Sequence, residues 1–481
     1  MVPRRPTAAV AVALLLVLAG CSGLVGSDAT DAPPATTASD GATPPSDTHT
    51  DATPTNAPDP AGPEPGTRAT APTPTGTPPP APPTVTRTEP PAPPTPTRTP
   101  SPAPTATPTS VPPTTTPPTD TATPGPEADG VGESARVPVE GALPVNATSV
   151  YRRTERLMGV SDEVPTVQVE NRTVDPSLGG PGPVGRALGF GEATGPVTEC
   201  GTLGSGSAGG GTVQVSTTNL TAASVELLLV HEYAHVLQDD VRGYENATRS
   251  LDATRGAMLE GSAVYVADAY ARRYGLTWEG KTPLELRECF YDRAENRVKL
   301  LTGQYYFGGD YFAGRLDSAA NLEAVFETPP ETAEQLVHGL APSAEPAAPL
   351  SVSVTESPDW LADRSRQRGE IFVRTWLSTA LSDERVDAAA TGWGNDTLVP
   401  FGHEGDTAAV AWTLRWDSAT DADEFASAVA DLAPTLESRR DTAIRQVRVA
   451  PDTVVVFAGA ASFVANATAS GTSGNVTVAP P

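Results

Sequence analysis

The apolar residues follow a helical pattern in the middle of the chain. Residues 222–239 form a strongly apolar run directly after Thr221, a residue type that caps helix N-termini, and the run predicts a buried helix. Two further helices are expected over residues 252–274 and 283–301, the latter beginning at Pro283, a favourable first-turn residue. These three helices would form the centre of the folded region.

Alternating apolar and polar positions predict strands on both sides of these helices. The expected strands are 166–169, 212–217, 408–416, 446–449 and 453–457. Shorter helical patterns occur at 311–316, 332–338, 360–381 and 421–432. The predicted fold class is α+β, with a helical centre, a small sheet and a mixed α/β C-terminal region.

The N-terminal third lacks the residues that build a core. All aromatic residues lie between Tyr151 and Phe463, and 31 of the 52 prolines lie between residues 22 and 130. Such a segment cannot bury enough apolar surface to offset the entropy of ordering. The predicted organisation is a signal peptide over 1–20, an extended stalk over 21–135, a helical domain over 136–350, an α/β region packed on it over 351–470 and a disordered tail over 471–481.

The N-terminus has the features of an export signal. Arg4 and Arg5 precede an apolar run over residues 8–18, which is too short to span a bilayer as a helix. The run ends in Leu-Ala-Gly-Cys21, which resembles a lipobox and implies that Cys21 carries a lipid anchor. An ordinary signal peptide with a chance cysteine is the alternative. The paired arginines leave the Sec and twin-arginine routes both open.

The charge balance narrows the choice of partners. The chain has 58 acidic and 32 basic residues, a net charge of −26, so nucleic acid and anionic lipid are excluded as expected partners. Only two of the basic residues, Lys281 and Lys299, are lysines. This composition resembles that of proteins from salt-loving organisms.

Sequons and cysteines favour an extracellular location. With Cys21 assigned to the anchor, Cys200 and Cys289 remain, and in an oxidising compartment they are expected to form a disulfide; two buried thiols are the alternative. Seven of the ten asparagines are in N-x-S/T sequons, which predicts N-glycosylation. The sites are Asn146, Asn171, Asn219, Asn246, Asn395, Asn466 and Asn475.

The most informative motif is an HExxH sequence on the first predicted helix. Residues four apart share a helix face, so His231 and His235 can both bind one Zn²⁺. Glu232 lies one position further round and is the expected general base for water. Two alternatives are a pair of histidines with a purely structural role and a metal site without turnover.

A catalytic zinc site needs a third protein ligand. Glu260 follows His235 by 25 residues, in Met-Leu-Glu-Gly-Ser-Ala on the second predicted helix, and this segment resembles the gluzincin metallopeptidases. The resemblance implies that Glu260 is the third ligand, and the adjacent Gly261 would let this helix approach the first. Three aspartates remain as alternative ligands: Asp239, Asp240 and Asp252.

The resemblance extends over most of residues 150–460. The chain is similar to secreted HExxH metallopeptidase-like surface proteins of archaea and bacteria, which implies a zincin-like core. The similar segments are 188–190, 211–215, 231–240, 305–316, 329–338, 391–396 and 416–425. One departure is Val264, where gluzincins have an aspartate that orients the first histidine. Asp239 and Asp268 are the candidate side chains for that supporting role, and a backbone carbonyl is the alternative.

Three more residues are candidates for contact with substrate. His338 could bind an oxyanion or a substrate carbonyl, or it could simply bond a carbonyl at a helix end. Tyr305 and Tyr306 could donate to a tetrahedral intermediate, although aromatics at this spacing also suit a core.

Together these observations predict a lipid-anchored, extracellular zinc metalloendopeptidase that acts on peptide or protein substrates. The alternative is a catalytically silent surface lipoprotein that keeps the same fold for binding or for a structural role. Neither the substrate nor the role of residues 351–470 is specified by the sequence.

Overall fold

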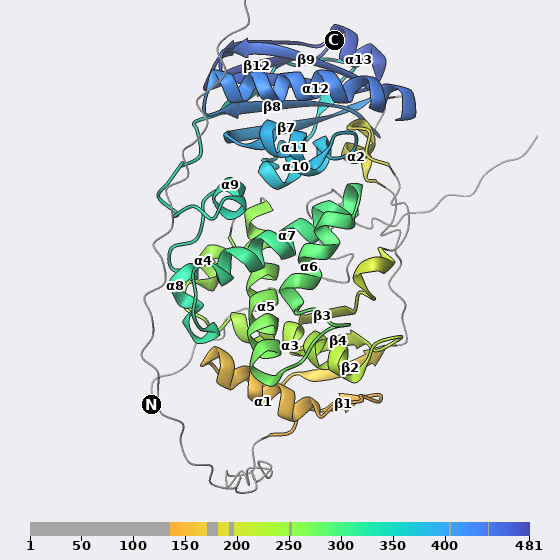
Figure 1. The fold of residues 1–481 in the computed structure, drawn as a ribbon. Helices are drawn as coiled ribbons and strands as arrows, with labels where there is room; N and C mark the ends of the chain where they lie inside the picture. Colours follow the sequence, from red (N-terminus) through yellow and green to blue (C-terminus); the bar gives the residue numbers. More distant parts are fainter. Residues whose placement is uncertain (1–134, 171–180, 192–196, 250–252, 404–405, 441) are drawn as a thin grey trace, which may run out of the picture. The chain divides into compact units, whose positions relative to one another are not determined.

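The computed structural model describes residues 135–481, apart from 171–180, 192–196, 250–252, 404–405 and 441 (Figure 1). The predicted signal peptide, Cys21, the stalk, Asp252 and the Asn171 sequon therefore lie outside the described residues. No helix in the described part is long and apolar enough to cross a membrane.

A small four-stranded sheet precedes the helical centre. Its order is β1-β2-β4-β3, and β3 is an edge strand that pairs antiparallel with β4. The strands are β1 (Val139–Glu140), β2 (Thr166–Glu170), β3 (Ser205–Gly209) and β4 (Thr212–Ser216). β2 and β4 match the predicted strands. The sequence analysis did not identify β3, nor helix α1 (Ala147–Met158), which Asn146 caps.

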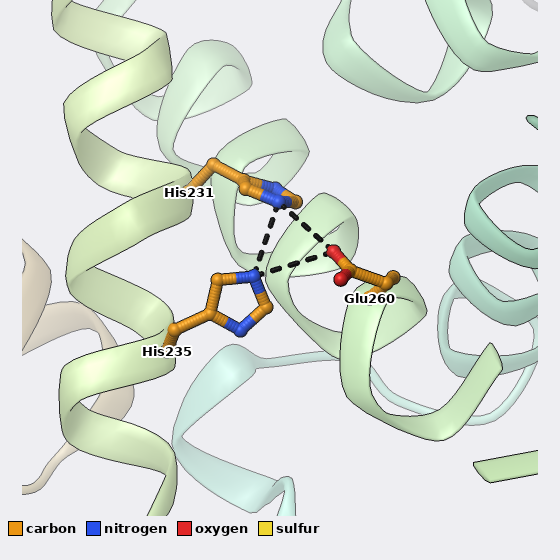
Figure 2. Close-up of side chains that lie close together, drawn as sticks. All are labelled: His231, His235 and Glu260. Atoms are coloured by element: carbon orange, nitrogen blue, oxygen red, sulfur yellow. Dashed lines mark hydrogen bonds and ion pairs between the residues drawn. The ribbon is translucent and has the colours of Figure 1, made fainter. Parts of the chain in front are cut away.

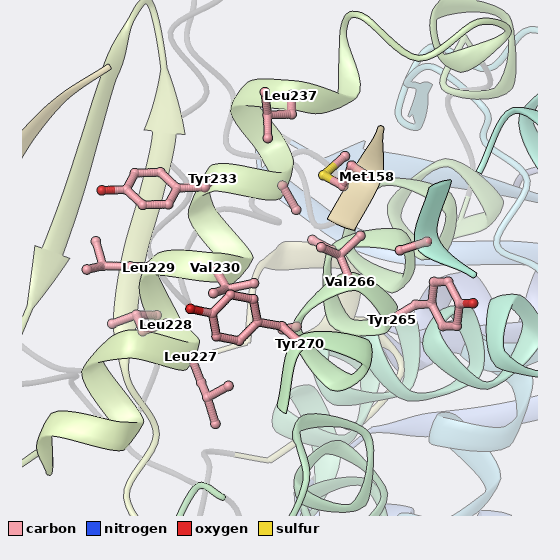
Figure 3. Packing of buried hydrophobic residues seen from close by; sticks show 14 of the residues in the cluster. Met158, Leu227, Leu228, Leu229, Val230, Tyr233, Leu237, Tyr265, Val266 and Tyr270 are labelled. Atoms are coloured by element: carbon pink, nitrogen blue, oxygen red, sulfur yellow. The ribbon is translucent and has the colours of Figure 1, made fainter. Parts of the chain in front are cut away.

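The helical centre confirms the predicted apolar run. α3 (Ala222–Gln238) and α5 (Ala253–Tyr274) match expectation. The predicted helix over 283–301 is instead two helices, α6 (Pro283–Arg293) and α7 (Asn296–Ala313), because Ala294 adopts an extended conformation. Figure 3 shows α3 side chains in the core beside residues of α5. The short helices are α2 (Pro183–Ala187), η1 (Thr198–Cys200), α4 (Tyr244–Ala247), η2 (Ala319–Asn321), α8 (Glu323–Phe326) and α9 (Ala333–Val337).

Glycines set the distance between α5 and α7. A Cβ atom on Gly261 would clash with the backbone of Gly308, and one on Gly308 would clash with the carbonyl oxygen of Ala257. Gly261 therefore serves the contact of α5 with α7, and the expected role against α3 is wrong. Because backbone meets backbone here, the position of α5 depends on the absence of these side chains.

A disulfide joins the segment before β3 to α6. Cys200 and Cys289 are bonded, with their Cα atoms 5.7 Å apart, which confirms the predicted pair. The bond spans 89 residues and stabilises the fold by about 4.6 kcal/mol on the chain-entropy model.

The C-terminal part is built on a five-stranded antiparallel sheet of order β6-β7-β8-β10-β9. Its strands are β6 (Leu361–Ala362), β7 (Trp393–His403), β8 (Asp406–Trp416), β9 (Ala443–Ala450) and β10 (Thr453–Gly459). α10 (Glu370–Leu377), α11 (Asp383–Ala390) and α12 (Ala419–Arg440) contribute to the core on one side of this sheet. Every residue of β10 is buried, as expected for a central strand with both faces covered.

The other side of this sheet has its own core, which includes the chain terminus. α13 (Ala461–Asn466) packs there with a small sheet of order β11-β12-β5. Its strands are β5 (Ser351–Val354), β11 (Thr468–Thr472) and β12 (Asn475–Ala479). The expectation of a disordered tail over 471–481 is wrong, because Val476 and Val478 are buried and β12 pairs with β5.

The predicted helix over 360–381 is wrong in its first half. Residues 361–362 form β6, and the helix begins only at Glu370. The buried carboxylate of Asp396, on β7, accepts hydrogen bonds from the backbone N–H groups of Arg368 and Gly369. These long-range bonds fix the two residues that lead into α10. The α+β class is confirmed.

The structure distinguishes the predicted glycosylation sites. Asn146, Asn219, Asn246, Asn466 and Asn475 are exposed. Asn395 is half-buried, and its Nδ2, the atom that would carry a glycan, donates a 2.7 Å hydrogen bond to Ala348 O. This geometry argues against glycosylation at Asn395.

Substituting Gly261 by alanine tests the contact between α5 and α7. We expect Gly261→Ala to lower the free energy of unfolding by about 1–3 kcal/mol, because the new Cβ forces the two backbones apart. Gly314→Ala is the matched control, since a Cβ there makes only ordinary contact. Urea unfolding curves of both variants give the comparison, and equal midpoints would contradict the packing argument.

Candidate metal centre

Three side chains from two helices converge in the buried contact of α3 with α5. His231 and His235 are one helical turn apart on α3, and Glu260 points toward them from α5 (Figure 2). One oxygen of Glu260, Oε2, lies 3.4 Å from His231 Nε2 and 3.3 Å from His235 Nε2. The two Nε2 atoms are 3.2 Å apart.

The spacing of these donor atoms suits a tetrahedral zinc ion. Ligand atoms about 2.05 Å from a tetrahedral Zn²⁺ lie about 3.3 Å from one another. The three atoms form a triangle with sides of 3.2, 3.3 and 3.4 Å, which matches one face of such a tetrahedron. Neither oxygen of Glu260 has a hydrogen-bond partner, although the residue is buried. The residues therefore fit a zinc ion with two imidazoles and one carboxylate as ligands.

Burial and mutual contact shift the pKa values of all three groups. Burial lowers the pKa of His231 to about 4, which keeps this imidazole neutral. For His235 burial alone would lower the pKa, but the Glu260 carboxylate outweighs it and raises the pKa to about 9. Glu260 itself would be raised by burial, yet the two imidazoles hold its pKa well below the usual range. The buried Glu260 carboxylate therefore strongly favours a positive charge next to it, and without a metal ion that charge is on His235.

Gln238 orients His235 and was missed in the sequence. Its Oε1 lies 3.0 Å from His235 Nδ1, while its Nε2 donates to Leu259 O at 3.0 Å and to Ser262 Oγ at 2.6 Å. Because Leu259 O can only accept, the amide oxygen must face the histidine, so Nδ1 carries the proton and Nε2 is free to bind a metal. Gln238 thus fixes the histidine and the turn of α5 that bears Glu260. The signal available in the sequence was its position three residues after His235.

Glu232 lies against β3. The residue is buried, and its carboxylate occupies the space that a side chain at Gly206 would fill. Burial raises the pKa of Glu232 to about 8, with a further increase from Glu260, while His235 and Arg287 oppose the shift. A glycine at this point of β3 is therefore required for the carboxylate to fit.

Arg287 was not among the predicted site residues. The ring of Tyr305 stacks on His231, with centroids 5.9 Å apart, and the guanidinium of Arg287 lies 4.4 Å from the centroid of the same ring. Burial lowers the pKa of Arg287, and Glu260 and Glu232 counteract that shift. Its Nη1 is buried without a hydrogen-bond partner. Arg287 belongs to no motif in the sequence, so it could not be predicted: only the fold brings it to the site.

The expected supporting aspartates have other roles. Asp268 binds Arg272 Nε at 2.6 Å and accepts from Leu284 N at 3.1 Å, so it links α5 to the start of α6. Asp239 is the C-cap residue of α3, and neither it nor Asp240 belongs to the triangle of donor atoms. The expectation that Asp268 orients a histidine is therefore wrong, because its carboxylate bonds Arg272 and Leu284 N, and the one side chain bonded to Nδ1 of His235 among the described residues is Gln238.

His338 and Tyr306 lie elsewhere. His338 follows α9 and its Nε2 is 3.1 Å from Glu370 Oε1, in a separate group with Glu334. The structure therefore brings His338 neither to the metal ligands nor to a carbonyl at the helix end. Tyr306 bonds Glu288 on α6 and stacks on Tyr291.

Comparison with known proteins adds one finding. Residues 360–480 match the family described as Domain of unknown function (DUF8575), which covers the C-terminal part of the chain and none of the metal centre. Neither curated proteins nor solved structures give a match.

Removing the Gln238 amide tests how the histidine is oriented. We expect Gln238→Leu to weaken zinc binding by about 10–100-fold, the usual effect of losing a hydrogen bond to a ligand histidine. His235→Ala should remove binding altogether, from one equivalent to none. Competition with a chromophoric chelator measures both.

The matched control is Gln214→Leu, which removes a glutamine amide that bonds Gln168 on the sheet. Its zinc affinity should equal that of the parent. An unchanged affinity in Gln238→Leu would show that His235 is oriented by other contacts.

Proposed function

We propose that this chain is a zinc metallopeptidase with a zincin-like core, anchored by lipid at Cys21 and exposed outside the cell. The observation that carries the proposal is the triangle of donor atoms from His231, His235 and Glu260, with sides of 3.2–3.4 Å. Helix α3 bearing the HExxH motif, helix α5 bearing the third ligand, and a small sheet with an antiparallel edge strand support the zincin-like interpretation.

Glu232 is the proton acceptor in this proposal. A bound Zn²⁺ would polarise the substrate carbonyl and make water a better nucleophile. The Glu232 side chain is held beside β3, within electrostatic reach of both His235 and Glu260, and in its ionised form it can take a proton from water. The same group can then give that proton to the leaving amine.

Arg287 stabilises the negative charge that develops on the carbonyl oxygen. Its buried Nη1 has no partner among the described residues, and the Tyr305 ring that it contacts also contacts His231. A fixed, partly desolvated guanidinium is an effective donor to an oxyanion, because no solvent must reorganise when the charge forms. Its presence favours turnover over a catalytically silent scaffold.

The edge strand β3 offers a place for an extended peptide. In the described part of the chain β3 pairs with β4 alone, and the Glu232 carboxylate fills the space where a side chain on Gly206 would lie. An extended chain that pairs with the outer edge of β3 would run past the base by strand addition.

The surface location rests on separate features of the chain. The lipobox-like Cys21, the exposed sequons and the Cys200–Cys289 disulfide all suit an oxidising, extracellular compartment. An acidic chain of net charge −26 suits a soluble peptide substrate better than a nucleic acid.

Replacing the base without disturbing the ligands tests catalysis. We expect Glu232→Gln to lower kcat by about 10²-fold or more while zinc content stays near one equivalent, because only the proton acceptor is lost. Hydrolysis of a peptide library by parent and variant at high salt, with zinc analysis of both, is the measurement. Hydrolysis by neither protein would favour the silent surface lipoprotein.

Replacing Arg287 tests the oxyanion role. Arg287→Gln should lower kcat by about 10²–10³-fold with little change in KM or zinc content, since the lost donor acts mainly in the transition state. Arg293→Gln, on the same helix but exposed and paired with Glu199, is the matched control. A rise in KM at constant kcat would instead assign Arg287 to substrate binding.

A further inference from the structure

A second group of acidic side chains lies where α9, α10 and the end of β8 meet. One carboxylate, Glu334 on α9, is common to two sets of donor atoms that lie within 4.8 Å of one another. The first set adds His338 and Glu370, and the second adds Glu345 and Asp417. These five residues are called the Glu334 cluster below.

Glu334 is buried without a partner. The residue is 3% exposed, and its carboxylate forms no hydrogen bond or ion pair with any described residue. The neighbouring Glu370 has a fully buried side chain, and its Oε2 is likewise without a hydrogen-bond partner. Buried carboxylates in proteins normally have a hydrogen-bond donor or a cation, so Glu334 lacks an expected partner.

The cations nearby are bound to other groups. Arg374 bonds Glu370 Oε1 at 2.7 Å and also Asp387, while His338 bonds the same oxygen of Glu370. Arg415, close enough to oppose the raised pKa of Asp417, bonds Asp452 and the carbonyl oxygen of Pro349. None of these donors bonds Glu334.

The electrostatic result is a strongly perturbed carboxyl group. Burial raises the pKa of Glu334 to about 9, and repulsion from Glu370, Asp417 and Glu345 adds to the effect. The pKa of Asp417 is also raised, by burial and by Glu345 and Asp421. Without a cation, Glu334 must keep a proton at neutral pH.

We propose that the Glu334 cluster binds one Ca²⁺ ion through the carboxylates of Glu334, Glu345 and Asp417. Ca²⁺ takes oxygen ligands at about 2.4 Å, so two of its ligand atoms can be at most about 4.8 Å apart, and the observed spacing meets this limit. Three carboxylates match this hard cation, and the exposure of Glu345 and Asp417 leaves room for water ligands. The imidazole of His338 stays with Glu370.

The site joins segments that are distant in sequence. Glu334 belongs to α9, Glu345 to the loop that follows it, and Asp417 to the residue just after β8. A cation bound by all three would tie the loop and α9 to the large sheet. The ion therefore acts on the stability of the fold and is independent of the zinc centre.

Calcium titration of the purified protein, with one equivalent of zinc present and ionic strength constant, tests this site. We expect one Ca²⁺ per chain by calorimetry, with a Kd of roughly 10⁻⁴–10⁻³ M. The unfolding midpoint should rise by about 3 °C at ten times the Kd. Mg²⁺ at the same concentration is the control for general screening of the acidic surface.

Three variants separate the site from other effects. Glu334→Gln should weaken Ca²⁺ binding at least tenfold and, without Ca²⁺, should unfold at about the parent temperature, because the amide has nearly the shape of the protonated acid and is likewise uncharged. Glu384→Gln, an exposed carboxylate on α11 outside the cluster, and His235→Ala should both keep the Ca²⁺ response. Equal responses to Ca²⁺ and Mg²⁺ in the parent, or a parent-like Ca²⁺ response in Glu334→Gln, would overturn the proposal and leave Glu334 as a protonated acid.

Discussion

The buried contact between α3 and α5 is the constraint on which the rest of the structure depends. It holds two imidazoles and a carboxylate so close that their donor atoms lie 3.2–3.4 Å apart. A rotation of either helix by a fraction of a turn would separate them. Gln238 bridges both helices beside the ligands, and Gly261 and Gly308 let α7 hold α5 from another side. A metal centre of this kind needs backbone precision, which close helix packing supplies.

A chain of contacts extends from the ligands to the disulfide. His231 contacts Tyr305, Tyr305 contacts Arg287, and Arg287 is two residues before Cys289 on the same helix. The bond to Cys200 therefore anchors α6 close to the guanidinium that we assign to the oxyanion. Under this interpretation, export to an oxidising compartment and the completeness of the site are linked, since the disulfide forms only there.

The acidic character of the chain has two different consequences. Most carboxylates of the described residues are exposed, where they keep the surface hydrated. A few are buried and have specific roles: Asp396 fixes the residues that lead into α10, Glu370 anchors Arg374 and His338, and Glu334 has no partner among the described residues. The net charge of the chain cannot distinguish the exposed carboxylates from the buried ones, because it does not depend on where each residue lies in the fold.

The sequence by itself determined what depends on neighbours within one or two helical turns. Local periodicity predicted the apolar run of α3, the spacing of His231 and His235 on one helix face, and the class of the fold. A simple count gave the even number of cysteines in the folded region. The sequence did not predict the break between α6 and α7, which arises from the extended conformation of Ala294. It also did not predict the start of α10, because the residues that lead into this helix are fixed by a distant side chain, Asp396.

Tertiary structure alone decided which side chains meet. It joined Glu260 rather than Asp239 or Asp240 to the histidines, gave the orienting role to Gln238, brought Arg287 to the site and placed His338 beside Glu370. It also paired residues 475–478 with β5 across more than a hundred residues of chain. Such pairings follow from the packing of whole elements, and the sequence around each residue carries no local record of its distant partner.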